Sequence, residues 1–192
     1  EYSTNEKVAF EAATGAAWSG VRAMACQKHF GLNVAADSIL PVAVTGVRAG
    51  LVVMVADDPS GWSSAQSEED TRYYARMFKM PMLEPSNPQE CLDFTKLAFD
   101  MSEEFQVPVF LRTTTKVSHS IGTVRLGEMK KPEVRGRFQK DPDRYYNLRP
   151  YLQVLHERLN KKLEQIEERY GQKLNKVFPR EGKIGIITSG VS

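Results

Sequence analysis

The chain has little cysteine, no long apolar run and almost no net charge. Its 192 residues include only two cysteines, Cys26 and Cys91, which lie far apart and show neither a CxxC nor a Cys/His spacing. We therefore expect no disulfide framework and no zinc site, and a reducing cytoplasm as the compartment. No stretch approaches the roughly 20 apolar residues that cross a bilayer, so no membrane segment is expected.

The charge is balanced, with 26 basic and 24 acidic residues and a formal charge of +2. So small an excess creates no field that would recruit nucleic acid or a membrane surface. One run is locally basic and leaves a non-catalytic binding segment open as an alternative function. Acidic residues dilute it and no aromatic platform accompanies it, so nucleic acid is not expected as a partner. The run contains Arg125, Lys130, Lys131, Arg135, Arg137, Lys140, Arg144 and Arg149.

The first 120 residues alternate between helical and strand patterns. Helices are expected at about 5–18, 33–40, 68–79 and 88–104, and strands at about 21–26, 51–56, 81–84 and 107–112. Ser3 and Glu6 have capping-box spacing, and Pro41 is expected to stop the second helix. The run 51–56 is too apolar for a half-exposed sheet. The pattern predicts an α/β fold with a parallel sheet covered by helices.

After residue 120 the pattern changes. The segment 122–149 holds several Gly and Pro residues and an excess of Arg and Lys, which predicts a linker. An apolar stripe over 152–170 predicts a long amphipathic helix. The apolar residues 184–187 predict a strand that enters a further α/β domain, so we expect the chain to be a piece of a longer polypeptide. The expected domains are 1–120, 121–181 and 182–192.

Glu6 is the first candidate site residue, and it has two interpretations. As the last member of a capping box it would only stabilise the helix. Alternatively, Glu6 begins a stripe of small residues that lets another backbone or a flat ligand approach closely. The stripe continues through Ala9, Ala13, Ala16 and Ala17.

Two further candidates follow predicted strands, where open α/β sheets bind their ligands. The segment 28–33 contains Lys28 and His29, although these residues could simply decorate a turn that Gly31 permits. Asp57 and Asp58 follow the next strand and could be a cap, a magnesium ligand or a substrate contact. Two adjacent carboxylates are weak support for a metal, because neighbouring residues rarely point at one ion.

Several motifs together resemble the alpha subunit of indolepyruvate:ferredoxin oxidoreductase, one of the 2-oxoacid oxidoreductases that use thiamine diphosphate. The matching residues are 3–9, 28–29, 31–37, 45–47, 55–59, 83–86, 112–114 and 117–120, with Gln66, Glu68, Asp70 and Arg72. The resemblance implies that residues 1–120 are an incomplete pyrimidine-binding domain. It also implies that Glu6 is the catalytic glutamate, which hydrogen-bonds a nitrogen of the cofactor's pyrimidine ring.

The resemblance implies further contacts along the same edge. Cofactor contacts are expected from Glu6, His29, Gly31 and Asn33. Substrate contacts are expected from Lys28, His29, Asp57 and Asp58.

By the same resemblance, the complete enzyme would oxidatively decarboxylate aryl 2-oxo acids to acyl-CoA and pass electrons to ferredoxin. It would use thiamine diphosphate with magnesium, and 4Fe-4S clusters located elsewhere in the full-length chain. A beta subunit, ferredoxin, coenzyme A and the 2-oxo acid are the expected partners, in an oligomer. Pyruvate or a branched-chain acid is the alternative substrate, and this piece alone is expected to be inactive.

Overall fold

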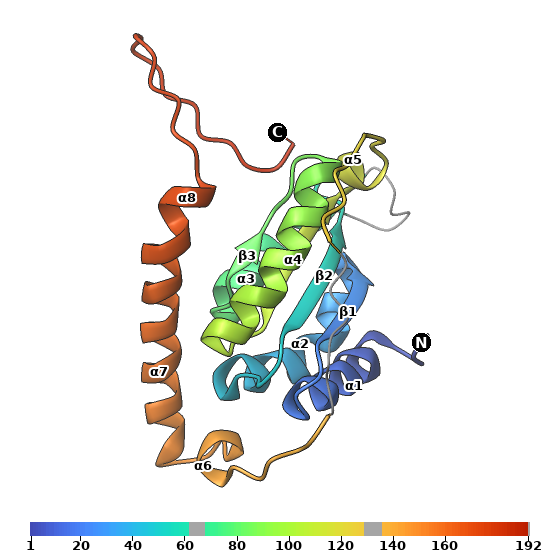
Figure 1. Cartoon of the computed structure of the whole chain (residues 1–192), viewed down its shortest axis with the longest axis vertical. Coiled ribbons are helices and arrows are strands. Elements are labelled where there is room, and N and C mark those ends of the chain that lie inside the picture. Colours follow the sequence, from blue (N-terminus) through green and yellow to red (C-terminus); the bar gives the residue numbers. More distant parts are fainter. Residues whose placement is uncertain (62–67, 129–135, 192) are drawn as a thin grey trace.

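A computed structural model describes residues 1–61, 68–128 and 136–191. Gln66, Lys130, Lys131 and Arg135, which were singled out above, lie outside these ranges. The described residues form a four-stranded, fully parallel sheet with the order β1-β2-β4-β3 (Figure 1). The strands are β1 (Ala23–Lys28), β2 (Leu51–Asp57), β3 (Met82–Leu83) and β4 (Val109–Thr114). The predicted α/β class with a parallel sheet is confirmed.

The pairing register brings the candidate residues to one edge of the sheet. Lys28 pairs with Ala56, and Ala56 pairs with Thr113. Because the strands are parallel, their carboxyl ends meet at the same edge. His29, Asp57 and the end of β4 therefore lie along this edge, which we call the carboxyl edge.

Helices cover both faces of the sheet. One face packs against α1 (Glu6–Trp18), α2 (His29–Thr45) and α3 (Arg72–Phe78), through a cluster that includes Phe10, Leu32 and Phe78. The other face packs against α4 (Pro88–Phe105) and α7 (Tyr151–Ile166). Alternate residues of β2 serve the two clusters, which explains why this strand is apolar throughout. Short helices complete the structure: α5 (Thr115–Ser118), α6 (Pro142–Tyr145) and α8 (Gln172–Leu174).

The second helix differs from its prediction. It was expected over 33–40 with a stop at Pro41, but α2 begins at His29, passes through Pro41 and ends at Thr45, before Gly46 with a φ of 74°. Buried residues on both sides of the proline, Ile39 and Val42, hold the helix against the sheet. Packing against the sheet therefore compensates for the backbone hydrogen bond that Pro41 cannot make. Gly31 consequently lies inside a helix, and the turn proposed for it is wrong.

The start of α1 also differs from its prediction. The cap is Asn5, whose Oδ1 accepts a hydrogen bond from the Val8 backbone N–H at 3.0 Å. Glu6 is the first helical residue, so the predicted Ser3–Glu6 capping box is wrong. This removes the capping explanation for Glu6 and leaves its carboxylate to be explained by its tertiary surroundings.

The long amphipathic helix is confirmed. Leu155, Leu159 and Ile166 of α7 are buried, and a π-helical turn at Glu167–Gly171 leads into α8. Residues 182–189 have no regular secondary structure, and their isoleucines are exposed. The further domain therefore stays a prediction. In the part of the chain that the structure describes, no helix has the length and apolar character needed to cross a membrane.

Candidate functional site

The Glu6 side chain lies against the first turn of α2. A Cβ placed on Gly31 would be 2.9 Å from both Cδ and Oε1 of Glu6, and closer still to Cγ. Gly31 is the third residue of α2, so the carboxylate sits at the positive end of that helix dipole, a favourable place for a negative charge. The stripe of small residues on α1 packs against α2. Of the two partners proposed for this stripe, another backbone and a flat ligand, the structure shows the backbone.

His29 lies beside this contact as the first residue of α2. It is 2% exposed, and neither ring nitrogen has a hydrogen-bond partner. The neighbouring Gln27, which is 8% exposed, also lacks partners for its side-chain oxygen and nitrogen. Buried polar groups without partners are costly, and they are found where a ligand or bound water completes them. His29 and Gln27 are therefore two buried polar side chains without protein partners near the carboxyl edge.

Two members of the predicted site, Lys28 and Asn33, are exposed. The Lys28 ammonium is 5.0 Å from the centre of the Phe30 ring, a cation–π contact that leaves the charge accessible. Asn33 donates from Nδ2 to Glu69 Oε2 at 3.1 Å and accepts a hydrogen bond from the Tyr74 hydroxyl at Oδ1. Asn33 thus connects α2 to α3 within the protein, and its predicted contact with a cofactor stays a prediction.

Asp57 is the centre of a buried charge network. Its Oδ2 accepts hydrogen bonds from Arg112 Nε at 2.6 Å and from the Thr71 hydroxyl at 2.9 Å, and both Asp57 and Arg112 are 1% exposed. Arg112 also pairs with Glu84 at 2.6 Å. Burying an ion pair is costly unless its remaining donors and acceptors are engaged, as they largely are here. The network therefore holds together the ends of β2, β3 and β4.

Asp70 extends this network toward the surface. Hydrogen bonds from Arg72 lower the pKa of the Asp70 carboxyl, and Asp70 also lies 3.6 Å from Arg112. That distance exceeds a hydrogen bond, so the Arg112 contact is a longer-range charge attraction.

Asp58, next in the chain, is also buried. Its Oδ1 accepts a hydrogen bond from the Thr115 hydroxyl at 2.8 Å, and its backbone forms an isolated bridge with Glu69. Both aspartates thus have partners within the protein, and the substrate contacts predicted for them stay predictions. Within 1–61, 68–128 and 136–191, no three His, Cys, Asp or Glu side chains are grouped so that they could hold a metal ion.

The structure places the predicted residues in two adjacent groups at one edge. Glu6, His29 and Gly31 form the first, and Asp57 and Asp58 belong to the second. Sequence reasoning missed Arg112 as a structural residue and Gln27 as a buried polar group. The signal for Arg112 was present, because an arginine inside the apolar strand VFLRTT must be paired if it is buried.

The first group suits a flat heterocycle with ring nitrogens. The half-buried Glu6 carboxylate has no ion-pair partner among the described residues, so it is available to a ring N–H or ring nitrogen. The nitrogens of His29 and the amide of Gln27 are also unpaired, but they are buried beneath the surface. The Glu6 carboxylate is therefore the group that fits a ring nitrogen of the aminopyrimidine that the resemblance implied.

Comparisons with known proteins identify the family of the chain. The family described as pyruvate flavodoxin/ferredoxin oxidoreductase, thiamine diP-bdg matches residues 3–177. The chain is 50% identical to the indolepyruvate oxidoreductase subunit IorA of Thermococcus kodakarensis, over the whole chain and 31% of the relative. It is 48% identical to the IorA subunit of Methanothermobacter thermautotrophicus, over 99% of the chain and 31% of the relative. The resemblance found in the sequence is confirmed.

One solved structure has a similar fold. The 2-oxoglutarate:ferredoxin oxidoreductase from Magnetococcus marinus superposes with a TM-score of 0.58 over 88% of this chain and 37% of its own. The identity is only 12%, so this likeness concerns the fold alone. The chain spans about a third of the length of the curated relatives that it matches.

Proposed function

Because the chain belongs to the pyruvate flavodoxin/ferredoxin oxidoreductase family of thiamine diphosphate-binding domains, we propose that it supplies the pyrimidine-binding side of a 2-oxoacid:ferredoxin oxidoreductase. The observation that carries this proposal is the Glu6–Gly31 contact beside the unpaired polar atoms of His29 and Gln27. This chain spans only 31% of the length of the two IorA relatives described above, so we propose the reaction for the complete protein and not for this chain alone.

Glu6 is the proposed catalytic residue. Its carboxylate would hydrogen-bond a ring nitrogen of the pyrimidine and hold a proton at that atom. Thiamine diphosphate, when bound, supplies the electron sink that permits loss of carbon dioxide from a 2-oxo acid. The contact with Gly31 fixes the position of the carboxylate, because glycine has no side chain and leaves room for that of Glu6.

His29 and Gln27 would supply polar groups beneath the cofactor, and Asn33 would hold α2 against α3. Lys28 would attract the carboxylate of a 2-oxo acid, and the Phe30 ring beside it offers an apolar surface to an aryl group. Asp57 contributes by holding the strand ends together with Arg112.

The proposed substrate is an aryl 2-oxo acid of the indolepyruvate kind. The support is the identity of 45–50% to six IorA subunits, against 31% over 58% of the chain to a 2-oxoglutarate synthase subunit KorA. A beta subunit, ferredoxin, coenzyme A, magnesium and 4Fe-4S clusters would complete the enzyme.

The test uses the complete protein assembled with its partner subunit. We expect Glu6→Gln to lower turnover by roughly 10²-fold or more, because general acid–base contributions have about this size. Glu11→Gln, on the same helix, is the matched control and should keep activity within twofold. Wild-type activity in Glu6→Gln would overturn the assignment. Turnover of indolepyruvate, pyruvate, a branched-chain 2-oxo acid and 2-oxoglutarate would rank the substrates, and a preference for any of the last three would overturn the aryl proposal.

A further inference from the structure

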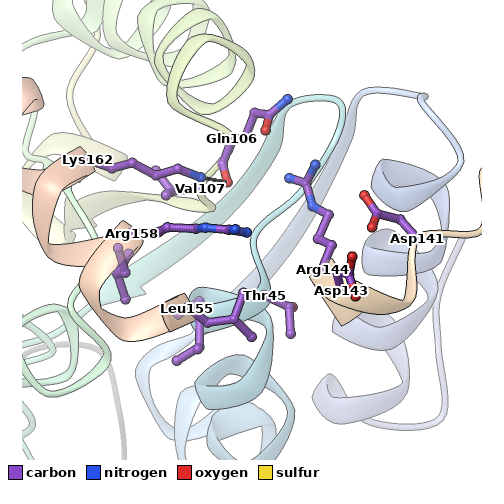
Figure 2. A pocket seen from close by; sticks show the side chains of 12 residues that line it. Thr45, Gln106, Val107, Asp141, Asp143, Arg144, Leu155, Arg158 and Lys162 are labelled. Carbon is purple, nitrogen blue, oxygen red and sulfur yellow. Dashed lines mark hydrogen bonds between the residues drawn. The ribbon is translucent and has the colours of Figure 1, made fainter. Parts of the chain in front are cut away.

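A cavity lies away from the carboxyl edge. It has a volume of about 210 Å³ and is lined by the C-terminal end of α2, the turn between α4 and β4, and the helices α6 and α7 (Figure 2). Because α2 and α4 end here, the cavity lies at the amino edge of the sheet, opposite the proposed catalytic group.

Three cationic side chains converge on this cavity. Arg158 and Lys162 project from successive turns of α7, and Arg144 projects from α6 on the other side (Figure 2). Lys162 Nζ donates to the Gln106 carbonyl at 3.4 Å, and Arg144 donates to the Val47 carbonyl. These contacts use one donor of each side chain, whereas an ammonium has three and a guanidinium five.

The cations outnumber the carboxylates that line the cavity. None of the three forms an ion pair with a carboxylate of the described residues, and the Arg144 Nε is buried without a partner. Asp141 and Asp143 also line the cavity, on the α6 side, so the five charged groups sum to +1. Burial and repulsion from Arg144 and Arg158 lower the pKa of Lys162 to about 8. The cavity therefore carries a small excess of positive charge.

We propose that this cavity binds a phosphate group, either as a free ion or at the end of a nucleotide, through Arg144, Arg158 and Lys162. One guanidinium group can donate hydrogen bonds to two oxygens of the same phosphate, and a lysine ammonium adds a compact positive charge. The anion would use the donors that the carbonyls leave free and would offset the repulsion among the three cations. This site is independent of the proposed catalytic group.

The experiment measures binding by titration calorimetry in the complete protein, saturated with thiamine diphosphate and magnesium so that the cofactor's own phosphate site is occupied. Inorganic phosphate and ADP are the probes, and chloride at equal ionic strength is the background. Arg158→Gln and Lys162→Gln should each weaken phosphate binding at least tenfold. Lys161→Gln is the matched control on the exposed side of the same helix and should change it less than twofold. Arg158 is exposed, so its loss does not threaten folding.

A second measurement uses pH. Sulfate, whose charge is constant between pH 7 and 9, should bind more weakly as Lys162 loses its proton near pH 8. The other charged groups that line the cavity are Arg144, Arg158, Asp141 and Asp143, and arginine and aspartate side chains ordinarily titrate far outside this range. Lys162→Gln should remove this dependence. The absence of saturable binding, an equal loss in Lys161→Gln, or equal binding of chloride would overturn the proposal. Tighter binding of inorganic phosphate would identify the ligand as the free ion, and tighter binding of ADP would identify it as a nucleotide. Both results support the site.

Discussion

Replacing Gly31 by alanine should separate the position of Glu6 from its chemistry. The added Cβ would lie 2.9 Å from Cδ and Oε1 of Glu6. Carbon atoms in contact prefer about 3.5 Å or more, so the carboxyl carbon must retreat by about 0.6 Å and Cγ by more. A misplacement of about 1 Å can cost roughly 10²-fold in rate. We therefore expect Gly31→Ala to lower turnover of the complete enzyme by one to two orders of magnitude.

The fold should survive this change. Gly31 lies inside α2, where alanine is favoured over glycine by about 0.5–1 kcal/mol, and the opposing atoms all belong to one side chain, that of Glu6, which can change its rotamer. Overpacking typically costs about 1–3 kcal/mol, so the two effects partly cancel. Thermal unfolding of the complete protein should therefore shift by only a few degrees while activity falls.

The matched control is Gly15→Ala in α1. Its Cβ would meet no atom within 4 Å, so activity should stay within twofold of wild type. Glu6→Ala, which removes Cγ, Cδ and Oε1, should make the remaining activity insensitive to Gly31→Ala, because the atoms that clash are gone. Steady-state kinetics of the single and double variants measure this coupling. Full activity in Gly31→Ala, or single effects that simply multiply in the double variant, would refute the reasoning.

Two further predictions concern the charge network behind the site. Asp57→Asn should lower the free energy of unfolding by about 3–5 kcal/mol, since it leaves Arg112 buried without its main counter-charge, whereas Asp37→Asn at an exposed pair should have no measurable effect in the same denaturant titration. The pKa of Asp70 is lowered in the folded state, so its contribution to stability is present above the ordinary aspartate pKa and lost as pH falls through the lowered one. Asp70→Asn should therefore flatten the acid limb of a stability-against-pH curve, and an unchanged acid limb would contradict this.

The clearest sequence predictions were those carried by local pattern. The apolar run 51–56 appears as β2 with both faces buried, and the helix predicted from residue 88 is α4, with Pro88 at its first position. These succeeded because a strand covered on both sides has no polar face, and because proline suits the start of a helix. The predictions that were wrong depended on distant residues. Local rules stop a helix at Pro41, but its packing on the sheet continues it.

The sequence by itself determined the α/β class, the parallel sheet and, through its motifs, the family. These follow from hydrophobic periodicity and residue identity, which are local properties of the chain. Only the tertiary structure decided that Glu6 meets Gly31 rather than a capping serine, and that Arg112 pairs with Asp57 across 55 positions. Such contacts depend on how strands and helices are placed relative to one another, and the spacing of residues along the chain does not predict that placement.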